Sequence, residues 1–164
     1  MSVIARTLGS VPNYLPSLDR AVSDAADGLK VMLRMTATTR SMSDRRVESG
    51  EDAIRSAVND ARKHGIDVHE LALTVATAVV ASLPQHVPLP SVVVEEDGEI
   101  ALDWNETSDR SLTISVKQNG TLGYSALVGL KPDYGRAPFA GSIPDTVLFN
   151  LLRVYPLPTA ARRA

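Results

Sequence analysis

The chain has 164 residues, of which 44% are hydrophobic and 22% are charged, and its net charge is −2. This composition is typical of a folded globular protein, and it excludes a disordered chain or a strongly basic nucleic-acid-binding surface. The absence of cysteine excludes disulfides, thiolate metal sites and thiol nucleophiles. Neither a signal-peptide pattern nor an apolar stretch long enough to cross a bilayer is found, so we expect a cytoplasmic protein without a membrane segment.

The N-terminal region is expected to be an irregular arm followed by an amphipathic helix. Residues 1–16 contain one glycine and two prolines, and an apolar stripe with helical spacing then runs from Ser17 to about Thr36. The stripe consists of Leu18, Ala21, Val22, Ala25, Ala26, Leu29, Met32 and Leu33. We interpret it as a core-facing stripe, and a groove for a partner protein is the alternative.

Residues 37–50, ATTRSMSDRRVESG, are polar and lack a hydrophobic period. They predict an exposed loop or linker. Arg40, Arg45 and Arg46 in this segment are expected to be solvated, although an anionic partner would also suit them.

A helical hairpin is expected next. Its first helix begins at Ser49 and ends at Gly65, a residue suited to the left-handed conformation that stops helices. Its second helix is predicted to have Asp67 as its cap and to end before Pro84, which opens a stiff proline-rich connector. Residues 1–83 therefore form the mainly helical half of the chain.

Residues 91–128 have the strongest period of two in the sequence, with apolar residues at alternate positions. The pairs Asp97-Gly98 and Asn119-Gly120 lie between the apolar runs, and such pairs supply the positive φ that tight hairpin turns need. This pattern predicts a four-stranded antiparallel meander.

The C-terminal part is predicted to be a glycine-rich loop over residues 129–141, GLKPDYGRAPFAG, and a short closing helix over residues 144–155. Tyr134, Arg136 and Phe139 are candidate partner-binding residues, because aromatic and arginine side chains on loops are common interface anchors. A structural role is the equal alternative. We expect a single α+β domain over residues 1–164, with N-terminal helices packed on the meander.

No familiar catalytic or metal-binding pattern occurs in the sequence. His64, His69 and His86 lack the spacing of a helical zinc site, and neither a phosphate-binding loop nor a nucleophile elbow is present. We therefore expect no catalytic residue, no metal and no cofactor, and a protein that is not an enzyme.

Acidic residues are concentrated in the first predicted hairpin. Residues 91–110 carry seven acidic groups and one basic group, a net charge of −6. The candidate partner-binding residues here are Glu95, Glu96, Asp97, Glu99 and Asp103. They favour a negative patch that binds a basic protein surface or imitates a phosphate backbone. A divalent-cation site and a solvated outer face that protects an edge strand are the alternatives.

The stretch LPSVVVEEDGEIALDW, which ends at Trp104, and the NGTLGY return after it carry a resemblance. They resemble a recurrent pattern in small uncharacterised α+β proteins of bacteria and mobile elements. In these proteins a proline-rich connector and an Asp-Gly turn lead into an alternating strand that tryptophan closes. The resemblance covers a third to half of the chain and brings no catalytic residues. Trp104 shares a strand face with Ile100 and Leu102, so we expect it in the core.

Together these features predict a non-enzymatic interaction protein with a protein partner, and nucleic acid is not expected as a direct ligand. The preferred role is an inhibitor, antitoxin-like or anti-defence partner in a bacterial or phage conflict system, acting through the acidic hairpin and the glycine-rich loop. One alternative is a secretion-chaperone-like or assembly subunit that acts as a homodimer. Another is a small metal-dependent hydrolase.

Overall fold

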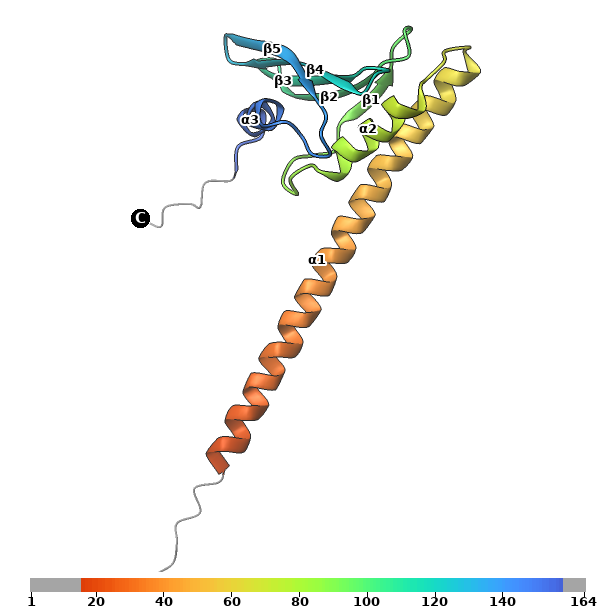
Figure 1. Cartoon of the computed structure of the whole chain (residues 1–164). Helices are drawn as coiled ribbons and strands as arrows, with labels where there is room; N and C mark the ends of the chain where they lie inside the picture. The colour runs from red at the N-terminus through yellow and green to blue at the C-terminus, as the bar shows by residue number, and fades with distance from the viewer. Residues whose placement is uncertain (1–15, 158–164) are drawn as a thin grey trace, which may run out of the picture. The chain divides into compact units, whose positions relative to one another are not determined.

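The structure is a computed structural model that describes residues 16–157 of the chain, with side chains from residue 27 onward. The expected arm before residue 16 and the basic tail after residue 157 lie outside the described residues. The chain divides into two compact units, residues 1–42 and 43–164. Its elements (Figure 1) are α1 (Pro16–Lys63), α2 (Glu70–Ala81), β1 (Ser91–Val94), β2 (Ile100–Thr107), β3 (Arg110–Val116), β4 (Thr121–Val128), β5 (Lys131–Pro138) and α3 (Asp145–Val154).

Residues 37–50 are helical, so the predicted loop between two N-terminal helices is wrong. Neither glycine nor proline interrupts the sequence between Gly28 and Gly50. The hydroxyls of Thr36, Thr38 and Thr39 donate to backbone carbonyls four residues earlier, at 2.8–2.9 Å. A hydroxyl bonded in this way is satisfied inside the helix, which it destabilises only slightly. The polar segment therefore continues α1 instead of ending it.

The described part of the predicted apolar stripe, Leu29, Met32 and Leu33, is not in a core, contrary to the expectation, and the stripe's side chains before residue 27 lie outside the described residues. Leu29, Met32 and Leu33 are 59%, 68% and 62% exposed. Every residue from 27 to 42 is classed as exposed. The spacing predicted the helix correctly and its surroundings wrongly, because periodicity does not show what a face packs against.

In the second unit, α1 ends as the sequence predicted. Gly65 has a φ of 80°. Its N–H donates to Arg62 O, and the N–H of Ile66 donates to Ala61 O at 3.1 Å. These two bonds form a Schellman motif, which satisfies carbonyls that the end of a helix leaves free.

The N-cap of α2 is His69, not Asp67 as predicted. The N–H of Leu71 donates to His69 Nδ1 at 3.2 Å, and His69 has the extended backbone typical of a cap. Histidine is not among the preferred capping residues, so the sequence signal pointed to the nearby aspartate. The helix begins at Glu70 and ends at Ala81.

Gly50 of α1 is buried beside Val80 of α2. A Cβ added to Gly50 would lie closer than 3.0 Å to Val80 Cγ1. A side chain at position 50 would therefore push α2 away. The buried residues Ile54, Val58 and Ala61 of α1 continue this contact surface into the core.

The five strands form one antiparallel sheet in the order β1-β2-β3-β4-β5. The meander is thus confirmed, with five strands where four were predicted. The β1–β2 and β3–β4 turns have the same design. In each, Gly98 or Gly120 has a φ near 80°, and its N–H donates to the carbonyl three residues earlier at 2.9 Å. Both Asp-Gly and Asn-Gly pairs therefore form the predicted turns.

The predicted glycine-rich loop is largely strand β5. Gly129, with a φ of 66°, begins a two-residue turn, and Lys131–Pro138 then pair with β4. The two prolines of this segment concealed the strand, because proline cannot donate to a sheet ladder. As an edge strand, β5 tolerates them. Tyr134 and Arg136 consequently lie on a strand, and Phe139 follows it.

The helices cover one face of the sheet. Helix α2 lies against β2 and β3, and α3 lies against β3 and β4 (Figure 1). The strand residues in this core are Ile100, Leu102, Trp104, Leu112, Ile114, Val116, Leu122 and Ala126. The expected core role of Trp104 is confirmed, since it is 2% exposed.

The proline-rich connector is held in place by two side chains. Trp104 Nε1 donates to Pro88 O at 2.9 Å, and Arg46 donates to the carbonyl of Val87. Partial burial lowers the pKa of Arg46 from its usual value. We had expected Arg46 to be solvated in a loop, or to bind an anionic partner. Instead, its guanidinium binds the proline-rich connector.

Helix α3 carries a buried polar residue. Asn150 is 0% exposed. Its Nδ2 donates to Asp133 Oδ2 on β5 at 2.7 Å and to Thr146 O at 3.1 Å, while Arg153 donates to its Oδ1 at 3.1 Å. The network links the closing helix to the edge strand, and it leaves the amide of Asn150 fully bonded.

The helix crossing predicts opposite effects for two glycines of α1. Gly50→Ala should lower the free energy of unfolding, because the new Cβ collides with Val80. Gly28→Ala, which meets nothing within 4 Å, should raise helix content, since alanine favours a helix by about 1 kcal/mol over glycine. Urea unfolding followed by circular dichroism measures both. A stabilised Gly50→Ala protein would contradict the crossing.

The buried network predicts a second effect. Asn150→Leu should lower the free energy of unfolding by about 1–3 kcal/mol, because Asp133 and Arg153 lose a buried partner. The double variant Asn150→Leu/Asp133→Leu should recover part of this loss, since no carboxylate is then left unpaired. Urea unfolding measures the loss in each variant. If the double variant lost as much free energy of unfolding as Asn150→Leu alone, or as much as the sum of the two single variants, a coupled network would be contradicted.

Candidate functional site

The sheet has a second face that points away from α2 and α3, which we call the open face. The strand register places its residues in three central rows across the sheet. Two rows follow the register directly, Val93-Ala101-Ser115-Gly123-Arg136 and Ser91-Asp103-Thr113-Ser125-Tyr134. The third is Glu99-Lys117-Thr121-Pro138, in which Thr121 pairs with Pro138, Lys117 N–H donates to Thr121 O, and Lys117 forms an ion pair with Glu99. Five of these fourteen residues are serine or threonine and four are charged, so the face is neither an apolar core surface nor a uniformly charged one.

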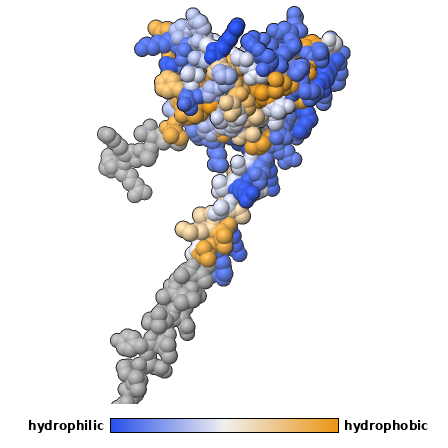
Figure 2. Space-filling view, viewed as in Figure 1, coloured by the Kyte–Doolittle hydropathy of each residue, from blue (hydrophilic) through white to orange (hydrophobic). Residues whose placement is uncertain are grey.

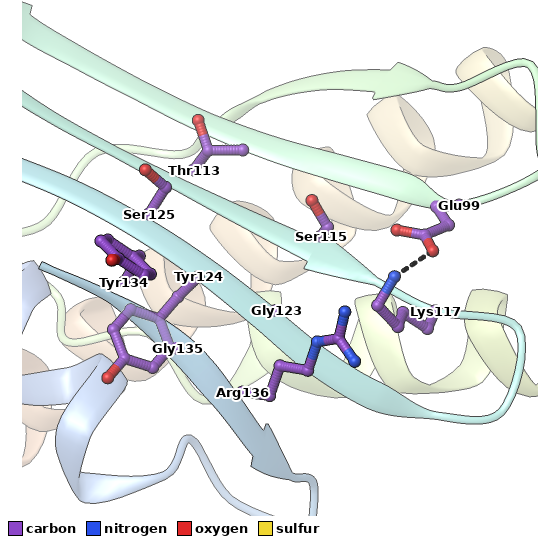
Figure 3. Close-up of a pocket in the computed structure, with 10 residues that line it drawn as sticks. All are labelled: Glu99, Thr113, Ser115, Lys117, Gly123, Tyr124, Ser125, Tyr134, Gly135 and Arg136. Carbon is purple, nitrogen blue, oxygen red and sulfur yellow. Dashed lines mark hydrogen bonds and ion pairs between the residues drawn. The ribbon is translucent and has the colours of Figure 1, made fainter.

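An open groove of about 320 Å³ runs over the middle of this face. Its floor is formed by Thr113, Ser115, Gly123 and Ser125 on β3 and β4. Figure 3 shows Tyr134 and Arg136 along one side and the Glu99–Lys117 pair at one end. The groove exists because short side chains in the two central strands are bordered by longer ones.

The groove floor contains one glycine, Gly123, and nothing in the local structure requires glycine at this position. It lies in the middle of β4, its φ is not positive, and an added Cβ would find its nearest neighbours at 3.8 Å. By contrast, a Cβ on Gly135 would lie closer than 3.0 Å to the Tyr124 ring. Glycine weakens a strand, and it often marks a position where a ligand or another backbone approaches closely.

Tyr134 and Arg136 border the groove from the edge strand β5. Tyr134 is 77% exposed. Arg136 is also exposed and makes no ion pair within the described residues. Two residues apart on one strand, they share a face. The structure thus brings together two of the predicted candidates, on a rigid strand rather than on a loop.

Phe139, the third candidate of that segment, is not part of the groove. It is half-buried and packs against the hydrophobic core. Phe139 follows β5 directly, and its side chain lies at the edge of the core, so it does not serve as the predicted interface anchor.

The acidic candidates separate into two groups. Glu99 forms an ion pair with Lys117, and Thr113 Oγ1 donates to Asp103 Oδ1 at 2.6 Å. Both carboxylates lie on the open face and have partners there. Glu95, Glu96 and Asp97 are exposed in the β1–β2 turn instead. The five residues therefore do not form one continuous patch.

Asp97 also has a structural part in its turn. Its Oδ1 accepts from the N–H of Glu99 at 3.1 Å, and its backbone carbonyl accepts from Gln118 Nε2 at 2.6 Å. Together with the Glu99–Lys117 pair, this second contact ties the β1–β2 turn to the β3–β4 turn. Glu95 and Glu96 remain as the exposed carboxylates without such a part.

Two further pKa shifts lie outside the groove. The hydroxyl of Thr107 donates to Asp109 at 2.6 Å and thereby lowers the pKa of this carboxyl. Burial raises the pKa of Tyr155, and the nearby carboxylate of Glu106 adds to this increase. Neither group faces the groove, so these shifts do not bear on the candidate site.

The groove floor was missed at the level of sequence. The signal was present, because Thr113, Ser115, Gly123 and Ser125 occupy the polar phase of two alternating strands. A polar phase is usually a plain solvated face. Only the register shows that the four positions are neighbours.

Comparison with protein-family models, curated proteins and solved structures finds no match. Among the described residues, no group of three or more histidine, aspartate or glutamate side chains is placed to hold a metal ion. No helix within residues 16–157 is long and apolar enough to cross a membrane.

The groove floor predicts an unusual stability effect. Gly123→Ala should raise the free energy of unfolding by about 0.5–1 kcal/mol, because alanine loses less conformational freedom in a strand and meets no close neighbour. Gly135→Ala is the matched control and should lower it, because the ring of Tyr124 occupies the space. Chemical unfolding of both variants measures the difference. A destabilised Gly123→Ala protein would mean that the glycine serves the fold.

Proposed function

We propose that this protein is a non-enzymatic interaction protein that binds another protein through the open face of its sheet. The observation that carries the proposal is the groove floored by Gly123, where the fold gives up strand stability without a local steric reason. A binding surface explains this cost, because a Cβ at position 123 would fill the space that a partner side chain or backbone enters.

The border of the groove supports a protein partner. Tyrosine and arginine are enriched among the residues that contribute most to protein–protein binding. Tyr134 and Arg136 are held on a paired strand, so little conformational freedom is lost when they are covered. Arg136 has a planar guanidinium suited to two hydrogen bonds with a carboxylate. The partner is therefore expected to bring a carboxylate to this side of the groove.

The charge on the open face argues against nucleic acid as the ligand. Lys117 is neutralised by Glu99, and Asp103 adds a negative charge to the same face. Phosphate backbones need several free basic groups. Glu95 and Glu96, at the turn beside this face, would instead attract a basic patch on a protein and increase the rate of association.

Within this class we propose an inhibitor, antitoxin-like or anti-defence role in a bacterial or phage conflict system. The exposed acidic turn and the resemblance to proteins of bacteria and mobile elements support this role. A chaperone-like or assembly subunit is the second candidate, and the exposed apolar residues of α1 favour it. The two candidates differ in the partner, which is a foreign protein in the first and includes further copies of this chain in the second.

The proposal predicts that substitutions on the open face abolish partner binding without unfolding the protein. Tagged wild-type chain and a Tyr134→Ala/Arg136→Ala variant are used to purify partners from an extract of the encoding organism, with quantitative mass spectrometry as readout. Proteins enriched by the wild type should be lost by the variant. Gly123→Leu should cause the same loss by filling the groove.

The matched control is Phe149→Ala/Arg55→Ala, which removes an exposed aromatic residue and an exposed arginine outside the open face. It should retain the partner. Glu95→Lys/Glu96→Lys should weaken binding of the purified partner mainly at low salt, because only steering is lost. Identical enrichment by the wild type and both open-face variants would refute the proposed site.

A further inference from the structure

The first unit leaves a broad apolar surface without cover. Leu29, Val31, Met32, Leu33, Met35 and Met42 are 52–68% exposed in the chain as described. Figure 2 shows hydrophobic residues gathered on this stretch of α1. Contiguous exposed apolar patches on soluble proteins usually mark interaction surfaces. An isolated helix of this length is also marginal in water, and packing normally supplies its stability.

The apolar surface is wider than an ordinary amphipathic stripe. At about 100° per residue, the six apolar residues and the intervening threonines cover an arc of roughly 200°. Asp27, Lys30, Arg34 and Ser41 occupy the remaining polar stripe. The threonine hydroxyls bond to carbonyls of their own helix, so their methyl groups contribute to the apolar arc. An arc this broad needs more than one helical neighbour.

An area estimate gives the same result. The helix from residue 16 to residue 42 is roughly 40 Å long, and one neighbouring helix about 10 Å wide would cover ~400 Å² of it. A standard stable interface covers about 800 Å² of each partner. One helical neighbour therefore falls short, and two neighbours meet the requirement.

The charge sequence of this segment fits other copies of the same segment. Residues 16–27 contain three aspartates and one arginine, while residues 28–42 contain three basic residues and no acidic one. Antiparallel pairing places the acidic half of one copy beside the basic half of the next. Parallel pairing would instead place Lys30, Arg34 and Arg40 beside the same three residues. The antiparallel arrangement also sets the helix dipoles against each other.

We propose that residues 16–42 of α1 assemble with the same segment of three other copies into an antiparallel four-helix bundle. The exposed apolar arc of each helix is covered by two neighbours, and each neighbour runs in the opposite direction. This assembly is independent of the open face, so the two proposals stand or fall separately.

Sedimentation equilibrium of the full chain measures the assembly. The wild type should have a mass of about 70 kDa, four times the 17.6 kDa of one chain. Leu29→Gln/Met32→Gln/Met35→Gln should be monomeric, and glutamine keeps the helix because it is a good helix former. The matched control Ala37→Gln/Ser41→Gln changes the polar side of the helix and should remain tetrameric. Circular dichroism establishes that each variant is folded.

Charge reversal decides the orientation. Lys30→Glu/Arg34→Glu/Arg40→Glu should raise the dissociation constant at least tenfold in an antiparallel bundle, because acidic residues then face acidic residues. Adding Asp19→Lys/Asp24→Lys/Asp27→Lys to the same chain should restore assembly. In a parallel bundle the first variant would assemble as well as the wild type, which would overturn the antiparallel arrangement.

Three other results would overturn the proposal. A wild-type chain that is monomeric at every concentration tested would show that copies of this chain do not cover the apolar arc. A stable dimer would overturn the four-helix arrangement. Retention of the assembled mass by the glutamine variant of Leu29, Met32 and Met35 would place the interface elsewhere.

Discussion

The second unit depends on one constraint, which is that its sheet is buried on a single side. Helices α2 and α3 cover the face that carries Trp104 and Ile114, and this side supplies the hydrophobic core. Alternation along the strands then turns every other residue outward. The open face is consequently free of any packing requirement. Its small residues and the groove above Gly123 are compatible with the fold because the opposite face carries the stability.

The same constraint explains which elements the sequence could predict. Three central strands have clean alternation and two Asp-Gly or Asn-Gly turns, so the meander was predictable. Gly65 likewise marked the end of α1. Strand β5 was hidden, because proline and glycine are rare in strands and only its edge position makes them acceptable. The helical segment 37–50 was hidden because serine and threonine have weak propensity, and their bonds within the helix are not visible in composition.

The candidate site was predictable only in part. Tyr134 and Arg136 were identified by residue type, although their strand was not. The charge count identified Glu99 and Asp103 but overstated their availability to a partner. Strand pairing places Lys117 beside Glu99 and Thr113 beside Asp103, and the sequence alone does not show this pairing. The groove floor required that register as well. Residue type thus indicates which side chains can bind, and strand pairing decides which of them meet.

Both edge strands of the sheet have features that disfavour pairing with a further strand. Pro132 and Pro138 lie within β5, and neither can donate a hydrogen bond to an incoming chain. On the other side, β1 has only four residues and lines a groove together with Ala57 and His64 near the end of α1. The two prolines and the short β1 disfavour the addition of a partner's backbone to the sheet, so recognition is expected to rely on side chains of the open face. The same two features also disfavour edge-to-edge pairing between sheets of two copies of this chain.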